Sequence, residues 1–392
     1  MSDLADLSDL ARQGAGLLAR RRPQAALEVL RRAVAQHPGC AESRLLLGRA
    51  CLQAGRGGEA VAVLEPLCAG HASAAALEAL AAAYRRDARY DEVLALARRQ
   101  GGPQLAYEAA MALTAQSRAA EALAAFDALL AEEPDLAAAW FGSHGPALEL
   151  LGWDEAERRL ARAAACRGAN RRYQALLAAY HRLLGRADAA PCPQSQRHLA
   201  EGAVALRPHL AEGWRLFGVS GSLLRWALGQ AERPGLVLEF GVRRGTSIAH
   251  LAAVAGQTVH GFDSFEGLPE AWVNGPSGAL TTERRLPAVP DNVVLHAGWF
   301  EDTLPGFLAA EAGPLRFANI DSDLYSSART VLTALAGRIG PGSILVFDEF
   351  IGNRSWRDDE YRAFHEHATE QGLSWSIIAV GLATKQVALR IG

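Results

Sequence analysis

A spacing of 34 residues recurs in the first half of this 392-residue chain and restricts that half to paired helices. Ala26 and Ala60 occupy the same place in two similar apolar segments, and Ala122 and Ala156 repeat the same separation. Turn-like breaks such as Gly55–Gly58 precede the copies. A small residue recurring at this period lets two helices approach closely, and stacked pairs then bury a core that they share. The pattern therefore predicts a solenoid of helical hairpins.

A helix–turn–helix period of this length resembles the tetratricopeptide repeat. The resemblance implies about four or five units over residues 9–186, with Gly48 at the small position of a first helix. Such arrays present a concave groove. We interpret the groove as a surface for a protein or peptide partner, or for a second copy of the chain, and a purely structural spacer is the alternative.

The pattern changes after the repeats. We expect residues 1–190 to form the helical repeat domain, residues 191–235 a linker with lead-in helices, and residues 236–392 a second domain. The proline-rich stretch around Pro191 and Pro193 predicts the linker. Within the lead-in, helices are expected over about 199–206 and 211–232.

Strand-like and helical segments alternate from residue 236 onward, and this alternation predicts a doubly wound α/β sheet with right-handed crossovers. The expected strands cover residues 236–242, 258–263, 293–298, 317–320 and 344–347, with helices at 246–255, 327–339 and 358–371. Two further β-rich runs, 374–380 and 386–391, are joined by a connection too short for a parallel crossover. We therefore expect the last strand to be antiparallel.

Two acidic clusters end consecutive strands of this predicted sheet. Asp321 and Asp323 follow the first, and Asp348 and Glu349 follow the second. The carboxyl ends of adjacent parallel strands share one crevice, where ligands bind. Converging carboxylates repel one another, so a hard divalent cation such as Mg²⁺ is the natural counter-ion. The alternative is that strand ends simply carry polar residues.

The first strand of the second domain runs into a glycine-containing turn. Gly241 and Gly245 permit close approach of the backbone to a ligand, and Asp263 at the end of the next strand can accept ribose hydroxyls. NAD, FAD and S-adenosylmethionine are the alternatives. Glu239 would repel a phosphate but suits the α-amino group of S-adenosylmethionine, and the Arg243–Arg244 pair crowds a pyrophosphate turn.

Several motifs in order resemble the macrocin-O-methyltransferase-like class I methyltransferases, over about residues 210–392. They lie at residues 238–245, 261–269 and 298–305 and in the two acidic clusters. The resemblance implies a seven-stranded class I methyltransferase fold, S-adenosylmethionine as donor, and metal-dependent O-methylation of hydroxyls on natural-product sugars. The chain departs from the family pattern at Asn319, where relatives often have His, and at Ser322, where they often have Cys.

The same resemblance implies roles for individual residues. Asp321, Asp348 and Glu349 match the metal-binding acids, and Asp323 matches a general base. The positions that match the donor-binding segments are Glu239, Gly241, Gly245, Thr246, Asp263, Ser264, Gly298, Trp299 and Asp321. The long loop over residues 265–290 is expected to be a lid or a wall of the substrate site.

The expected function is thus O-methylation of a small-molecule acceptor, with the repeats recruiting a partner or a carrier. One alternative is methylation of a protein or peptide gripped by the repeats. Another is a non-catalytic interaction scaffold that retains the methyltransferase fold.

Composition limits the partners and the cellular location that we expect for this protein. The net charge of −3 argues against nucleic acid or an anionic membrane as partner. The N-terminus lacks the pattern of a signal peptide, and no apolar stretch is long enough to span a bilayer. The five cysteines are scattered without metal-ligand spacing. We expect a cytoplasmic protein with reduced thiols, and a homo-oligomer is left open.

Overall fold

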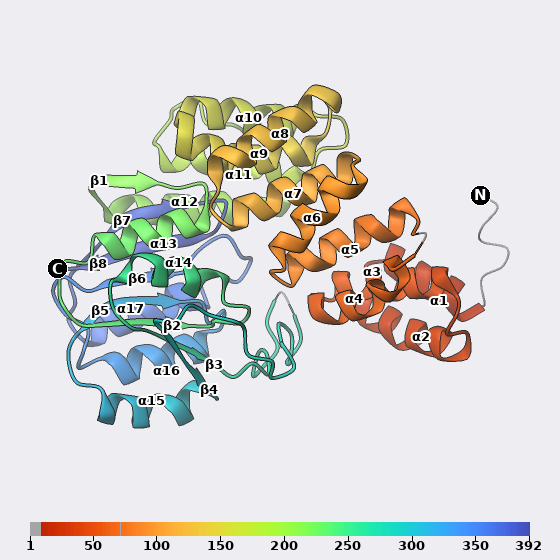
Figure 1. The fold of residues 1–392 in the computed structure, drawn as a ribbon. Helices are drawn as coiled ribbons and strands as arrows, with labels where there is room; N and C mark the ends of the chain where they lie inside the picture. Colours follow the sequence, from red (N-terminus) through yellow and green to blue (C-terminus); the bar gives the residue numbers. More distant parts are fainter. Residues whose placement is uncertain (1–8, 71, 274) are drawn as a thin grey trace.

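The computed structural model describes residues 9–70, 72–273 and 275–392. Figure 1 shows the helices of the first half, red to yellow, stacked beside a layered domain built on a twisted sheet, green to blue. The repeat helices are α1 (Asp9–Ala19), α2 (Pro23–Gln36), α3 (Ala41–Gln53), α4 (Gly57–Leu64), α5 (Ala74–Arg86), α6 (Tyr90–Gln100), α7 (Pro103–Ala115), α8 (Ala119–Glu132), α9 (Ala137–Leu151), α10 (Trp153–Ala165) and α11 (Arg171–Leu183). The predicted solenoid is confirmed.

The small residues that set the repeat period lie where helices meet. Ala26, Ala60, Ala122 and Ala156 are all fully buried. A Cβ atom on Gly48 would lie 2.6 Å from the Leu64 side chain, so α3 and α4 pack at a distance that only glycine permits. The spacing seen in the sequence is therefore the spacing of helix contacts.

None of these helices is suited to crossing a membrane. The longest among the residues with described structure is α9, with 15 residues, whereas a membrane-spanning helix needs about 20. No helix in the described ranges combines the required length with the required apolar character.

The second half forms one mixed sheet with the strand order β1-β7-β8-β6-β5-β2-β3-β4. Its strands are β1 (Leu210–Leu216), β2 (Leu236–Phe240), β3 (Val259–Asp263), β4 (Val293–Ala297), β5 (Leu315–Ile320), β6 (Ile344–Phe347), β7 (Trp375–Gly381) and β8 (Gln386–Ile391). The helices around it are α12 (Arg197–Leu206), α13 (Ser220–Gly229), α14 (Thr246–Ala255), α15 (Phe300–Ala310), α16 (Tyr325–Leu335) and α17 (Glu360–Glu370). The neighbours of β8 are both antiparallel to it, as predicted.

The prediction of a helix over residues 211–232 is wrong for its first part. Residues Leu210–Leu216 form β1, which pairs in parallel with β7, and only α13 lies within the rest of the expected helix. The segment has no strong strand pattern, and Gly213 takes a positive φ of 70°. Pairing with the open edge of β7 decides its conformation, because strand preference depends on the neighbouring strand. The seven predicted strands therefore gain an eighth at the edge.

The two faces of the sheet carry separate cores. Leu236, Leu238 and Phe240 of β2 contribute to one core, and Val237, between the first two, contributes to the other. This alternation follows the two-residue period of a strand. The first core also includes Leu176 and Tyr180 of α11. The last repeat helix thus packs in the same hydrophobic core as the sheet.

Candidate active site

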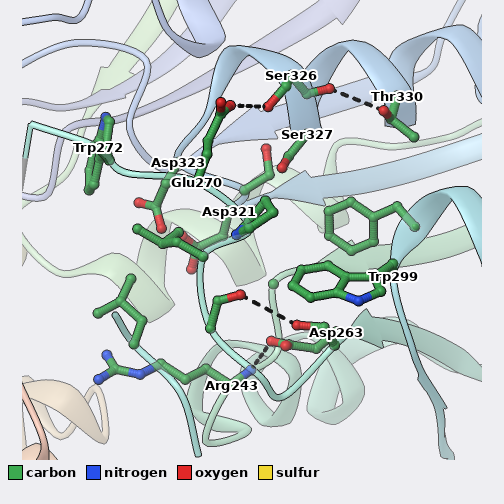
Figure 2. A pocket seen from close by; sticks show the side chains of 18 of the residues that line it. Arg243, Asp263, Glu270, Trp272, Trp299, Asp321, Asp323, Ser326, Ser327 and Thr330 are labelled. Atoms are coloured by element: carbon green, nitrogen blue, oxygen red, sulfur yellow. Dashed lines mark hydrogen bonds between the residues drawn. The ribbon is translucent and has the colours of Figure 1, made fainter. Parts of the chain in front are cut away.

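A cavity of about 600 Å³ lies at the carboxyl ends of β2, β3, β5 and β6. This is the edge at which parallel α/β sheets bind ligands. Figure 2 shows Trp299 and Asp263 on one side of the cavity, the acids of β5 in the middle, and Glu270 and Trp272 on the other side. The predicted site residues that line it are Gly241, Asp263, Ser264, Gly298, Trp299, Asp321, Asp323, Asp348 and Glu349.

Gly241 allows the turn after β2 to pass the end of β5. It adopts a φ of +98°, which side chains rarely tolerate. A Cβ atom there would lie 1.9 Å from the carbonyl oxygen of Asp321. The two strand ends can therefore meet in the cavity only with glycine at this position.

Asp263 ties this turn to the end of β3. Its Oδ2 accepts a hydrogen bond from the backbone N–H of Arg243 at 2.7 Å, and its Oδ1 accepts one from the N–H of Phe265 at 2.6 Å. Burial raises the pKa of Asp263, and these backbone donors oppose the shift. A carboxylate has about four lone-pair sites, so Asp263 retains capacity to accept a ligand hydroxyl.

Three residues predicted to bind the donor do not line the cavity. Glu239 is fully buried in β2, where its Oε1 accepts a bond from Asn319 Nδ2 at 2.8 Å. Burial raises the pKa of Glu239 to about 8. Gly245 begins α14 with a φ of +79°. Thr246 Oγ1 lies 3.1 Å from the hydroxyl oxygen of Tyr90, in the repeats.

The acids of β5 and β6 are crowded with one another. Asp321 has a pKa well above its usual value because of burial and then the nearby charges of Asp348 and Asp323. The pKa of Asp323 rises to about 8 through burial and the charges of Glu349 and Asp348. The pKa of Asp348 rises to about 7 through burial and the charge of Glu349. Burial and like charges in such a cluster favour the protonated acids, whereas an entering cation would favour the carboxylates.

Glu349 differs from the other three acids because it already has a cationic partner. Lys385, the one lysine of the chain, places Nζ at 2.7 and 2.8 Å from the two carboxylate oxygens of Glu349. Asn353 also donates to this carboxylate. Asp348 instead accepts a bond from Gln386 Nε2 at 2.6 Å. Over the part of the chain that the structure describes, no three Asp, Glu, His or Cys side chains are arranged as a ready-made metal centre.

Glu360, at the start of α17, holds the two acidic strand ends together. Its Oε1 accepts the backbone N–H groups of Ser322 and Asp323 at 3.0 and 3.1 Å, and its Oε2 accepts that of Glu349 at 3.1 Å. The residue is fully buried, and burial raises its pKa. Asp323 sits at a φ of +62°, a strained value for a residue other than glycine. The sequence did not point to Glu360, which reads as an ordinary acid in the first turn of a helix.

The loop between β3 and β4 forms a wall of the cavity. It contributes Gly267, Leu268, Pro269, Glu270, Trp272 and Leu280. Trp272 Nε1 donates to Asp359 Oδ2 at 3.1 Å, and Glu270 Oε1 accepts from Ser326 Oγ at 2.5 Å. Figure 2 shows Ser326, Ser327 and Thr330 of α16 on the same side. Hydroxyl groups and acids thus surround the end of the cavity opposite Asp263.

Arg243 lines the cavity, whereas its place in the sequence suggested only that it would crowd a pyrophosphate. Its side chain lines the cavity, and burial lowers its pKa to about 10. The guanidinium remains cationic at neutral pH and faces the charges of Asp321 and Asp323. The pair of arginines between Gly241 and Gly245 was the sequence feature that could have identified Arg243 as a cavity residue.

Comparisons with known proteins agree with this geometry. Residues 238–350 match a family model described as a methyltransferase domain, and residues 12–69 match one described as a tetratricopeptide repeat. The first match includes the turn, Asp263 and both acidic clusters. The second covers the beginning of the repeats.

Two curated relatives are O-methyltransferases. The 8-demethyl-8-(2,3-dimethoxy-alpha-L-rhamnosyl)-tetracenomycin-C 4'-O-methyltransferase of Streptomyces olivaceus is 34% identical over 168 residues, 36% of this chain and 60% of that protein. The demethyldecarbamoylnovobiocin O-methyltransferase of Streptomyces niveus is 30% identical over 164 residues, 35% of this chain and 62% of that protein. The chain thus spans less than two thirds of the length of either relative.

A crystal structure of a calicheamicin methyltransferase is 23% identical, with a TM-score of 0.36, and the match covers 44% of this chain and 77% of that one. The family matches do not depend on that likeness. The first part of the chain is thus similar to tetratricopeptide repeats over residues 12–69, and the second part to a methyltransferase domain over residues 238–350.

Proposed function

We propose that this protein transfers a methyl group from S-adenosylmethionine to a hydroxyl oxygen of a sugar-type small molecule. The observation that carries the proposal is the meeting, in one cavity, of a donor-type turn and an acidic cluster at the ends of β5 and β6. The two curated relatives are named for O-methylation, one of them at a 4' oxygen. The repeats would recruit a protein partner or a carrier of the acceptor, and a groove of about 490 Å³ among α6, α7 and α8 supports that role.

The donor would occupy the side of the cavity formed by β2, β3 and the start of α15. Asp263 ends β3 and retains acceptor capacity for ribose hydroxyls. Trp299, half-buried at the start of α15, offers a flat apolar surface for the adenine ring. Gly241 leaves room for the backbone to approach the ligand. These contacts orient the sulfonium methyl group toward the acids.

Asp323 would remove the proton of the acceptor hydroxyl. The hydroxyl oxygen attacks the methyl carbon, the carbon–sulfur bond breaks with its electron pair remaining on sulfur, and the hydroxyl proton passes to the Asp323 carboxylate. Burial and the neighbouring carboxylates raise the pKa of Asp323 toward neutral pH, which favours its acceptance of a proton there. The hydrogen bonds of Glu360 to the backbone at this strand end keep the carboxylate in place.

A divalent cation fits the chemistry of this cluster. Carboxylate oxygens are the preferred donors for Mg²⁺, and the raised pKa values of Asp321 and Asp348 indicate uncompensated negative charge. These two acids would hold the ion, and Glu349 would join them only by releasing Lys385. When bound, the cation would lower the pKa of an acceptor hydroxyl beside it.

Donor binding is the first test of the proposal. Isothermal titration calorimetry should detect S-adenosylmethionine and S-adenosylhomocysteine binding to the full chain. Turnover should then be measured on a panel of glycosylated small molecules by the mass gain of a methyl group. Absence of binding at millimolar donor would rule out the proposed activity.

The metal is tested separately with the Asp348→Asn variant. We expect it to lose magnesium-stimulated turnover and to keep donor binding, while Asp135→Asn, an exposed acid of the repeats, behaves as wild type. Turnover that survives both chelator and Asp348→Asn would remove the cation from the proposal and leave the methyl transfer intact.

A further inference from the structure

The turn that leads from β2 into α14 is held from behind by the helical repeats. Arg244 Nε lies 2.7 Å from Asp87 Oδ1, at the end of α5. The hydroxyl of Tyr90, the first residue of α6, lies 3.1 Å from that of Thr246. Arg243 Nη2 donates to the carbonyl oxygen of Gly55 at 3.5 Å. The donor-type turn therefore contacts the ends of two successive helical hairpins.

These contacts are largely removed from solvent. The side chains of Arg244 and Asp87 are only 12% and 23% exposed. An ion pair with this little exposure has a restricted geometry, in contrast to a pair on an open surface, and removing one partner leaves the other desolvated without compensation. Asp87 thus places a directional restraint on a backbone segment that lines the cavity.

The rest of the interface keeps the repeats from moving away as a unit. A Cβ atom on Gly145 of α9 would lie 2.5 Å from the carbonyl oxygen of Gly218, so the two backbones are in direct contact. Glu149 accepts the N–H groups of Gly218 and Val219, both at 3.1 Å. Because α11 also shares its core with the sheet, the repeats are fixed against the sheet. Asp87 and Tyr90 therefore have a defined position relative to the turn.

The cavity wall beyond the turn also lies against the repeats. Figure 1 shows the loop between β3 and β4 extending toward α4 and α5. A Cβ atom on Gly58 of α4 would lie 2.9 Å from Arg285 Nη2 in that loop and 3.1 Å from Asp87 Oδ1. Asp87 therefore stands where the turn, the loop and the repeats come together.

We propose that Asp87 and Tyr90 are positioning residues of the donor site, so that the repeats form part of the catalytic unit as well as a recruiting surface. They act through Arg244 and Thr246 to hold the turn over residues 241–246 in the conformation that receives the donor. This inference rests on the proposed function, since it assumes that the turn receives S-adenosylmethionine. The sequence alone gives no reason to assign a donor-site role to residues of a helical repeat.

The test compares full-length variants in calorimetric titrations with S-adenosylmethionine and S-adenosylhomocysteine. Asp87→Asn combined with Tyr90→Phe should weaken donor binding about tenfold, because the turn must then be ordered by the ligand. The turnover number at saturating donor should stay within about twofold of wild type, because the acids are untouched. Asp87→Glu, which keeps the charge, should retain much of the affinity.

The matched control is Asp91→Asn. This acid lies beside Tyr90 on α6, but it is exposed and interacts with Gln116 of the repeats. Donor affinity of Asp91→Asn should equal that of wild type. A circular dichroism melt establishes that each variant is folded before its affinity is compared.

Hydrogen exchange of the donor-free protein provides a readout that does not depend on activity. Residues 241–247 should exchange faster in the Asp87→Asn/Tyr90→Phe variant than in wild type or in Asp91→Asn. If wild type binds the donor and the double variant binds it equally well, the positioning role is wrong. If wild type binds no donor, the proposed function fails, and unchanged exchange would show in addition that the repeats do not anchor the turn.

Discussion

Paired acids in the repeats and crowded acids in the cavity have opposite electrostatic surroundings. In the repeats Glu108 lies 2.5 Å from Arg85, and Arg159 lies 2.6 Å from both Glu155 and Asp127. The pKa of Glu155 falls to about 2, chiefly because Arg158 and Arg159 donate to it. In the cavity the pKa values of Asp321, Asp323 and Asp348 are raised instead. In the repeats these acids lie beside arginines, whereas in the cavity Asp321, Asp323 and Asp348 lie close to other carboxylates.

The difference separates charges that stabilise the fold from charges that are kept for chemistry. Removing the partner of a buried, paired acid is costly, because the remaining charge is left uncompensated. A crowded acid opposes folding and persists where it serves a site. Substitution of a crowded cavity acid should therefore lower turnover more than stability, whereas disruption of a paired acid in the repeats should lower stability more than turnover.

The largest effect is expected from Asp323→Asn. Turnover should fall about 10²–10⁴-fold, because the proposed base is lost. Asparagine tolerates the left-handed backbone of this position, and the substitution removes an acid whose ionisation the crowded cluster opposes, so thermal unfolding should occur no earlier than in wild type. Methyl-transfer rates and melting curves measure the two effects. The contrast with the repeats is wrong if the turnover of the variant stays within tenfold of wild type or if the variant is less stable.

The converse is expected from Arg85→Met in the repeats. It leaves the carboxylate of Glu108, which is 4% exposed, without its ionic partner and with only the neutral donor Gln104. The free energy of unfolding should fall by about 3 kcal/mol, as measured by urea denaturation, with donor affinity unchanged in the folded protein. Combining it with Glu108→Gln should recover most of the loss. A single variant as stable as wild type would contradict the role assigned to paired acids.

A smaller effect with a defined pH dependence is expected from Glu239→Gln. The folded protein holds the Glu239 proton up to a pH of about 8, whereas the unfolded chain releases it near pH 4.3. Stability from this group is therefore lost progressively as pH rises through that window. Glu239→Gln should raise the free energy of unfolding at pH 7 and flatten its pH dependence.

Glu155→Gln is expected to change the free energy of unfolding in the opposite direction. The folded pKa of about 2 lies below the unfolded value, so the contribution of Glu155 is present above the unfolded pKa and is lost as pH falls toward 2. Urea denaturation at pH 5 and pH 8 distinguishes the two variants. If the free energy of unfolding changes equally with pH in Glu239→Gln and in wild type, Glu239 does not have the raised pKa described above.

The smallest effect concerns the residue that joins the two acidic strand ends. Glu360→Gln keeps one acceptor oxygen of two, so it can hold the backbone of Ser322 and Asp323 or that of Glu349, but not both. The turnover number should fall about tenfold, with the KM for the donor unchanged. A change confined to the donor KM would instead assign Glu360 to the donor side of the cavity.

Much of the architecture was predictable because it depends on short-range patterns. The 34-residue period follows from helix contacts that recur along the chain, and Ala26 and Ala60 are buried where the period places them. The antiparallel β8 followed from the short connection after Gly381. The strand β1 was missed because its conformation depends on β7, more than 150 residues later in the chain.

The residues of the candidate site also divide into those that the sequence could predict and those that depend on tertiary contacts. The acids of β5 and β6 were predictable, since apolar strands that end in acids mark the ligand-binding edge of a parallel sheet. Lys385 and Glu360 were not assigned to the site, because their partners are separated from them by 36 and by 37 or 38 residues of chain. The placement of Glu239 and Thr246 behind the cavity also depends on packing rather than on the motif that contains them.

The sequence by itself determined the two kinds of architecture and the position of the acids, because helix period, strand alternation and strand ends are properties of neighbouring residues. Only the tertiary structure decided which acids are paired and which are crowded. It also decided that Asp87 and Tyr90 of the repeats lie against the donor-type turn, across 157 and 156 residues of chain. The physical reason is that pKa values and contacts depend on distances in space, which packing sets after the local elements have formed.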